Sequence, residues 1–202
     1  MQEYIAIADP IRAHTGHLVQ LFDSDGSVVE AVAHFFAEGL LRNETMLAVM
    51  DAERWYSMVM RLSAAGLPID DALRSGRMTV RGADATLKKF MRKDRPDCGL
   101  FNASVGQLVS GLAAFHRPVR IYGEMVNVLA AQGEYAAACE LEELWNELGM
   151  RSEFRLFCGY SAAHFGDPRS ADALRRICAS HSEVLSSPQD VLGSFLVRAR
   201  TA

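Results

Sequence analysis

The fold is decided by the stretch His17-Leu18-Val19-Gln20-Leu21-Phe22-Asp23-Ser24-Asp25-Gly26-Ser27 and by the helix that follows it. Residues 17–23 are mostly apolar and predict a buried strand. Residues 28–41 place apolar side chains at helical spacing and predict a long amphipathic helix. A strand that turns directly into a helix is typical of the β-α-β unit, so the stretch predicts an α/β protein with a parallel sheet.

The turn between this strand and this helix is acidic. A nucleotide-binding P-loop would carry the pattern G-x-x-x-x-G-K-[ST] here, with backbone amides and a lysine around the phosphates. The turn instead contains Asp23, Asp25 and a single glycine. The chain has only three lysines, all within residues 88–93, and none of them follows a predicted strand. The sequence therefore disfavours a Walker-type ATPase and favours a binding or sensory role.

The alternation of strand and helix continues along the chain. Apolar runs predict further strands at residues 44–51, 77–81, 118–123 and 154–160. Amphipathic spacing predicts further helices at residues 52–65, 69–76, 83–93, 99–115, 125–131, 134–148, 170–179 and 188–199. The charged, proline-containing residues 92–97 are the expected mobile segment. We expect a three-layer α/β/α fold with a mostly parallel central sheet and additional C-terminal helices.

The composition suits one globular domain, because the chain has 202 residues, half of them hydrophobic, and a net charge of −4. We expect a leader at residues 1–16, the α/β domain at 17–166, and a helical extension at 167–202 that packs on the same domain. No apolar run approaches the ~20 residues of a membrane span. The N-terminus also lacks the basic start and apolar core of a signal peptide, so we expect a cytoplasmic protein without membrane contact. The scattered basic residues disfavour direct nucleic-acid binding.

Polar residues follow several predicted strands. In open α/β sheets, ligands bind beyond the carboxyl ends of the strands. We therefore expect a ligand-binding crevice lined by Phe22, Asp23, Asp25, Asp51, Glu124 and Tyr160. The alternative for Asp23 and Asp51 is that they cap the helices that follow them. Glu124 directly follows an apolar strand, where a catalytic base would lie, although an acid in a first helical turn also complements the helix dipole.

Established catalytic and metal-binding patterns are missing from the sequence. There is no G-x-S-x-G and no H-E-x-x-H. Cys178-x-x-His181, with Cys158 and His164 upstream, is too loosely spaced to predict a metal site. The cysteines form no C-x-x-C pair and are expected to be reduced and buried. We therefore expect neither a metal nor a cofactor.

Trp145 lies between the apolar stripe and the acidic face of the helix predicted at residues 134–148. Such a position predicts a mostly buried tryptophan whose indole N–H seeks an acceptor. The alternative is that Trp145 and Glu142 bind a partner protein or a second copy of the chain.

Short stretches spread over most of the chain form a recognisable set. The most specific are Gly123-Glu124-Met125 and Glu140-Leu141-Glu142-Glu143-Leu144-Trp145-Asn146. The others are Phe22-Asp23-Ser24-Asp25, Ala48-Val49-Met50-Asp51, Leu156-Phe157-Cys158-Gly159-Tyr160 and Ile177-Cys178-x-x-His181. Together, from about His17 to His181, they resemble the MEDS domain, the methanogen/methylotroph, DcmR sensory domain.

The resemblance implies a degenerate relative of the RecA/KaiC-type ATPase fold that lacks a working P-loop, in agreement with the acidic turn. It also implies a role in signal transduction, with a small molecule such as a hydrocarbon derivative as ligand. Members of the family occur alone or fused to histidine kinases or DNA-binding regions. A stand-alone member would signal through a partner such as a histidine kinase or a transcription regulator. His17, where the resemblance begins, joins the expected ligand-binding residues.

We therefore expect a non-enzymatic sensory domain that binds a small molecule in the strand-end crevice and signals through a partner protein. Two alternatives stay open. One is a metal-dependent nucleotide hydrolase or transferase that uses Glu124, with the metal held by Asp23 or Asp51. The other is an interaction adaptor without a ligand. ATP turnover would distinguish the first alternative, and a crevice that binds nothing would distinguish the second.

Overall fold

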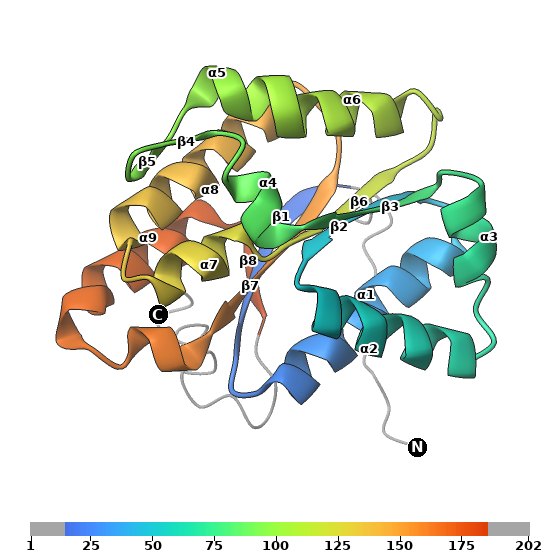
Figure 1. Cartoon of the computed structure of the whole chain (residues 1–202), viewed down its shortest axis with the longest axis horizontal. Coiled ribbons are helices and arrows are strands. Elements are labelled where there is room, and N and C mark those ends of the chain that lie inside the picture. The colour runs from blue at the N-terminus through green and yellow to red at the C-terminus, as the bar shows by residue number, and fades with distance from the viewer. Residues whose placement is uncertain (1–14, 186–202) are drawn as a thin grey trace.

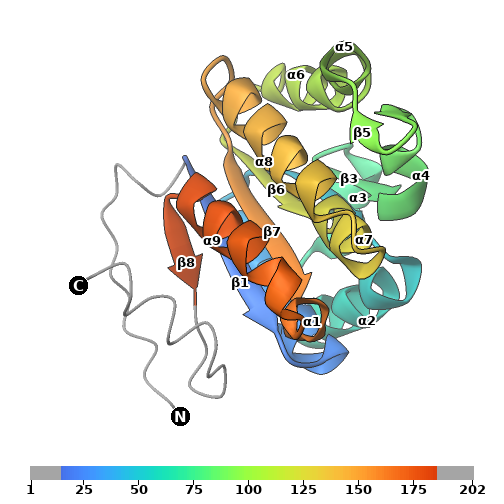
Figure 2. The same ribbon diagram turned by 90° about the vertical axis from the view of Figure 1, so that its left-hand side faces the viewer.

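A six-stranded sheet, parallel throughout, forms the middle layer of the structure, a computed structural model that describes residues 15–185. The strand order is β3-β2-β6-β7-β1-β8. The strands are β1 (Gly16–Phe22), β2 (Thr45–Met50), β3 (Met78–Gly82), β6 (Val119–Gly123), β7 (Arg155–Ser161) and β8 (Glu183–Leu185). Helices cover both faces of this sheet (Figures 1 and 2), which confirms the predicted three-layer α/β/α fold.

The helices divide into two groups, one on each face of the sheet (Figure 1). The first group contains α1 (Asp25–Leu41), α2 (Ala52–Ala64) and α3 (Ile69–Arg74). The second contains α4 (Ala83–Leu87), α5 (Cys98–Phe101), α6 (Gln107–Ala113), α7 (Met125–Ala131), α8 (Tyr135–Gly149) and α9 (Ala171–Ser180). None of the helices within residues 15–185 is both long enough and apolar enough to cross a membrane.

Successive side chains of each strand enter different cores, because side chains alternate between the two faces of a sheet. In β1, Leu18 and Phe22 pack with the first group of helices, whereas Val19 and Leu21 pack with the second. Every residue of β2 and β6 is buried, as expected for central strands covered on both sides.

The prediction of a helix at residues 83–93 is wrong beyond Leu87, where α4 ends. The chain there forms a small antiparallel hairpin of β4 (Met91–Arg92) and β5 (Arg95–Pro96). Lys93 adopts a φ of 57°, a left-handed conformation that ends helical geometry and suits a tight turn. Arg95 of the hairpin forms an ion pair with Glu140 of α8, so the segment expected to be mobile is attached to the domain.

Two further segments differ from the prediction. The helix expected at residues 99–115 is interrupted by a π-helical segment, Asn102–Gly106, between α5 and α6. After α9, Glu183–Leu185 forms β8, which pairs with β1 at the edge of the sheet. A three-residue strand is too short to show a periodicity of 2, so the sequence predicted only helices in this region. The helix predicted at residues 188–199 lies outside the described residues.

A buried ion pair joins β6 to the start of β2. Arg120 is 1% exposed, and its Nε donates to Glu44 Oε2 at 2.6 Å. Its Nη1 donates to the Phe35 carbonyl of α1 at 2.8 Å. The guanidinium therefore holds two strands and a helix together.

We predict that Arg120→Met destabilises the protein by about 3–5 kcal/mol, because it removes the guanidinium that faces the buried Glu44 carboxylate. Chemical denaturation followed by circular dichroism measures the change. Arg74→Met is the matched control, since its ion pair with Asp71 is exposed and should contribute about 0–1 kcal/mol. Equal stabilities of the two variants would show that the buried pair does not support the fold.

Trp145 of α8 is buried, with 1% of its surface exposed. Its ring makes edge contacts with Phe101 and Phe154, at centroid distances of 5.3 and 6.0 Å. The prediction of an acceptor for the indole is wrong, because Nε1 has no hydrogen-bond partner within residues 15–185. Glu142 is also fully buried. Neither side chain is accessible to a partner in this structure, and the burial favours the core interpretation of Trp145.

We predict that Trp145→Ala costs about 3–5 kcal/mol of stability, because it leaves a cavity among aromatic rings. Tyr56→Ala serves as the control. Tyr56 is 66% exposed, so its loss should change stability by less than about 0.5 kcal/mol. A Trp145→Ala melting curve that superimposes on the wild type would contradict the core assignment.

Candidate functional site

A crevice of about 250 Å³ opens at the carboxyl ends of β1, β6 and β7. This edge is where open parallel sheets bind ligands. Its lining combines acidic, aromatic, small polar and aliphatic residues with one arginine and one glycine, namely Phe22, Asp23, Ser24, Asp25, Val28, Arg54, Tyr122, Glu124, Asn127, Gly159, Tyr160 and Ser161.

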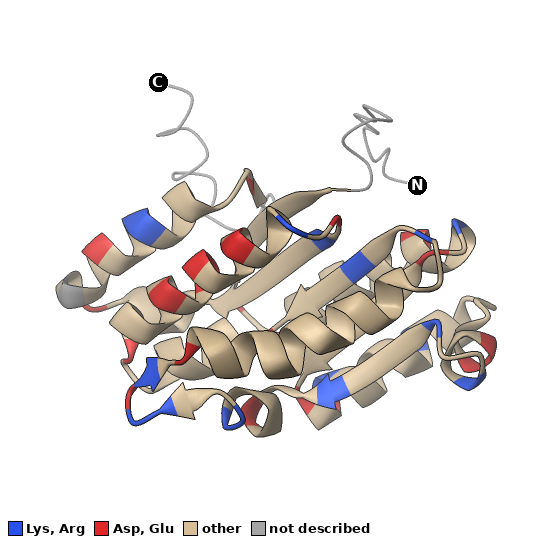
Figure 3. Cartoon of the chain, turned by 90° about the horizontal axis from the view of Figure 1, so that it is seen from above, with Lys and Arg blue, Asp and Glu red and all other residues tan. Residues whose placement is uncertain are grey.

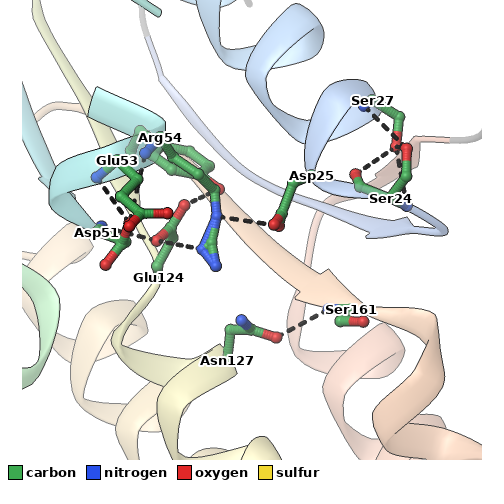
Figure 4. A network of polar contacts seen from close by, with 10 residues as sticks. Ser24, Asp25, Ser27, Asp51, Glu53, Arg54, Glu124, Asn127 and Ser161 are labelled. Atoms are coloured by element: carbon green, nitrogen blue, oxygen red, sulfur yellow. Dashed lines mark hydrogen bonds and ion pairs between the residues drawn. The ribbon is translucent and has the colours of Figure 1, made fainter. Parts of the chain in front are cut away.

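Glu124 is the centre of the polar network in this crevice (Figure 4). It lies between β6 and α7, and only 4% of its surface is exposed. Its Oε1 accepts a hydrogen bond from Tyr122 Oη at 3.1 Å. Its Oε2 accepts from the Asp51 backbone N–H at 2.9 Å and from Arg54 Nη1 at 3.4 Å. The carboxylate therefore connects the ends of β2 and β6 to the first turn of α2.

Burial changes the proton affinity of two groups in the crevice. It raises the pKa of Glu124 above the ordinary value, and Arg54 and the hydrogen-bond donors offset this effect only in part. Burial, together with the neighbouring Glu124 carboxylate, raises the pKa of Tyr122 well above the ordinary value. The Tyr122 hydroxyl thus stays protonated and donates to Glu124.

Arg54 is the cation of the crevice lining. Its Nε lies 3.4 Å from Asp25 Oδ1, and its Nη1 lies 3.4 Å from Glu124 Oε2. Both contacts are long for charge-assisted hydrogen bonds, which are typically ~2.7–2.9 Å. The lining contains three carboxylates, on Asp23, Asp25 and Glu124, against this single guanidinium. The crevice therefore favours cations and hydrogen-bond donors over anions such as phosphate.

Helix caps account for part of the acidic pattern. Asp51 Oδ1 accepts from the Glu53 backbone N–H at 2.8 Å and caps α2, as one interpretation of the sequence predicted. Asp23 is not the cap of α1. Ser24 has that position, in a capping box with Ser27.

The structure brings most of the predicted site residues together. Those that line the crevice are Phe22, Asp23, Asp25, Glu124 and Tyr160. Asp51 borders it through its backbone N–H, while its carboxylate faces the start of α2. His17 lies at the amino end of β1, away from the crevice, because Phe22 rather than His17 ends the strand. Instead, it lines a second cavity of about 410 Å³ together with Trp145 and His181.

Sequence reasoning missed three residues that shape the crevice. Arg54 follows Asp51 by one helical turn, so the predicted cap could have indicated it. Tyr122 lies on β6, two residues before Glu124, but a mostly apolar strand gives no sign that its tyrosine hydroxyl forms a hydrogen bond in the crevice. Asn127 of α7 accepts a hydrogen bond from the Ser161 N–H at 2.8 Å, a contact that only the packing of α7 on β7 reveals.

Gly159 of β7 lies beneath the Tyr122 hydroxyl. A Cβ at this position would lie 2.6 Å from Tyr122 Oη and 3.0 Å from a ring carbon of Phe22. The glycine therefore allows the tyrosine to reach Glu124. A side chain here would have to displace it.

We predict that Gly159→Ala destabilises the protein by about 1–3 kcal/mol through overpacking and displaces the Tyr122 ring. The matched control is Gly123→Ala on the neighbouring strand, where a Cβ would meet no atom within 4 Å. Thermal unfolding measures the stability, and near-ultraviolet circular dichroism reports the tyrosine environment. The prediction fails if the two variants are equally stable and have the same spectrum.

On the face shown in Figure 3, acidic residues recur along α8, while basic residues are dispersed.

No curated protein matches the sequence. A family match, in contrast, covers residues 16–181 of the 202, from β1 through His181 at the end of α9. The family is described as MEDS, the MEthanogen/methylotroph, DcmR Sensory domain. The match confirms the resemblance, and the chain belongs to the MEDS family of sensory domains.

Proposed function

We propose that this sensory domain binds a small aliphatic amine or alcohol in the crevice and transmits its presence to a signalling protein. The observation that carries the proposal is the buried Glu124 carboxylate, which faces a cavity of about 250 Å³ at the sheet edge where ligands bind. Drug-sized ligands occupy pockets of ~300–1,000 Å³, so the volume suits a smaller molecule.

The lining supports the same class of ligand. Phe22, Val28 and Tyr160 offer apolar surface to a short alkyl group. Glu124 and Asp25 offer acceptors to an ammonium or a hydroxyl group. A hydrocarbon derivative with one donor group matches both properties, whereas an anion would meet the excess of carboxylates.

Arg54 gives the ligand a way to change the protein. Its guanidinium contacts both Glu124 and Asp25 at 3.4 Å, and a cationic ligand would compete with it for those carboxylates. Arg54 lies in the first turn of α2, so its displacement would favour a second position of that helix. A ligand shifts a conformational equilibrium only through different affinities for the two states, and this competition supplies such a difference.

The surface of α2 supports transmission to a partner such as a histidine kinase or a transcription regulator. Tyr56 and Met60 of this helix are 66% and 53% exposed. They lie one helical turn apart, so they share one side of the helix. A partner that contacts this side would respond to a movement of α2.

We predict that methylamine binds to the purified protein and that Glu124→Gln weakens binding by about 10-fold or more, because a hydrogen bond to a charged group contributes about 1.5–3 kcal/mol. Titration followed by NMR of the protein measures the affinity. Glu30→Gln is the control, since Glu30 is an exposed carboxylate of α1 outside the crevice lining. Methanol and acetate complete the series as a neutral and an anionic probe of similar size.

Acetate binding that equals methylamine binding would contradict the proposed ligand class. The absence of any response to the three probes would favour a ligand-free adaptor. Phosphate release from ATP with magnesium tests the enzymatic alternative, and turnover that is lost in Glu124→Gln would replace the sensory proposal with a hydrolase.

A further inference from the structure

Four potential metal ligands converge in the core at the other end of β1. They are His17 of β1, Glu142 of α8, Cys158 of β7 and His181, which follows α9. All four residues are buried, and one ligand atom from each lies within 4.8 Å of the others. The function proposed for the crevice uses none of these four residues.

Hydrogen bonds fix the tautomer of His17. Asn146 Nδ2 donates to the Ser180 carbonyl at 2.9 Å, so Asn146 must present its Oδ1 to the other side. That Oδ1 lies 2.8 Å from His17 Nδ1, which therefore carries a hydrogen. His17 Nε2 then points toward Glu142 Oε2, 3.2 Å away.

His181 has the same arrangement. Its Nδ1 lies 2.6 Å from the Ile177 carbonyl, an oxygen that can only accept, so Nδ1 carries the hydrogen. Its Nε2 lies 3.5 Å from Glu142 Oε1. Both imidazoles thus point Nε2 at a single carboxylate, and their Nδ1 atoms are held by oxygen acceptors. This orientation by outer-shell oxygens is typical of metal-ligating histidines.

Two imidazole nitrogens and a carboxylate face one another in this arrangement, and a bound metal ion would satisfy all three groups at once. The distances suit an ion. His17 Nε2 lies 3.4 Å from Cys158 Sγ, and Cys158 Sγ lies 3.5 Å from Glu142 Oε2. A tetrahedral zinc ion with bonds of about 2.0–2.3 Å has ligand-to-ligand distances of roughly 3.3–3.6 Å.

Charge balance also favours a divalent ion. A Cys158 thiolate and a Glu142 carboxylate would neutralise it, so the buried site would carry no net charge. On binding, the Cys158 thiol would release its proton to solvent, as metal-ligating thiols do. Two nitrogens, one sulfur and one oxygen form a donor set that suits zinc and related transition metals rather than magnesium or calcium.

A cavity lies beside the site. His17 and His181 line the cavity of about 410 Å³, together with Asn146 and Ser182. The imidazole centroids of the two histidines are 3.9 Å apart, with a tilt of 45°. A tetrahedral ion would require the rings to move apart slightly, and the cavity beside them provides the room.

We propose that His17, Glu142, Cys158 and His181 bind a divalent transition-metal ion of the zinc type. Tyr160 donates to Glu142 Oε1 at 2.7 Å and forms part of the outer shell. Because Tyr160 also lines the crevice, occupancy of the metal site would be communicated to the ligand-binding end of the sheet.

Cobalt provides the test, because Co²⁺ replaces Zn²⁺ in such sites and gives visible spectra that report tetrahedral geometry and thiolate ligation. The full chain is stripped with a chelator and titrated with Co²⁺. We expect saturation at an equimolar amount, with tetrahedral d–d bands and a thiolate-to-cobalt charge-transfer band, and displacement of both by Zn²⁺. Cys158→Ser should lose the charge-transfer band. Cys139→Ser, the control with a buried thiol outside the cluster, should keep it.

The affinity of the variants separates metal binding from a purely structural network. His181→Gln should weaken Co²⁺ binding by more than about 100-fold, and Asn146→Ala, which changes a positioning residue, by about 10–100-fold. Stripped wild-type protein that binds no Co²⁺ would overturn the proposal, even if every variant failed to fold. A charge-transfer band that persists in Cys158→Ser, or is lost only in Cys139→Ser, would also overturn it.

Discussion

The Glu142 carboxylate, which has no exposed surface, ties together the elements of the second helical layer. It is presented by α8 and contacts β1 through His17, β7 through Tyr160, and the end of α9 through His181. A buried charge costs several kcal/mol unless it is compensated. Burial alone would raise the pKa of Glu142, but His181, His17 and the Tyr160 hydroxyl outweigh it and lower the pKa to about 2. Glu142 is therefore ionised in the core. The positions of α8 and α9 on the sheet are set by the groups that compensate it.

The layers of the fold could be predicted because long strands and helices impose a periodicity that the sequence displays. The buried runs of β2 and β6 and the amphipathic α1 are examples. Short elements could not be predicted, because they are too short to display such a periodicity. The β4–β5 hairpin and β8 contain too few residues to establish a period, and both depend on tertiary contacts, with Glu140 and with β1. The burial of Arg120 within β6 was equally hidden, since its partners come from α1 and from the start of β2.

The two sites differ in how far the sequence determines them. The crevice could be anticipated because parallel strands place their carboxyl ends at one edge, so Phe22, Glu124 and Tyr160 had to lie near one another. The cluster around Glu142 could not be anticipated in the same way. Contacts within it join residues that are 16 positions apart, as in Glu142–Cys158, and residues that are 141 positions apart, as in His17–Cys158. No local spacing links all four residues. The sequence suggested Glu142 only as a possible partner-binding residue, and charged residues are rarely fully buried. Its burial depends on partners from three other elements.

Tyr160 gives the two ends of the sheet a physical connection. Tyr160 lines the crevice at the end of β7, while its hydroxyl donates to Glu142 in the core. The burial of Tyr160 and the negative charge of Glu142 raise its pKa well above the ordinary value, so it remains a donor. If Glu142 turned toward an ion or away from it, this hydrogen bond would change, and the Tyr160 ring would have to adjust within a packed core. Packed cores resist continuous deformation, so such an adjustment would favour discrete positions of Tyr160, a residue that also lines the crevice. A sensory domain requires discrete states of this kind. Two ligands influence each other's binding only when each of them binds the two states with different affinities.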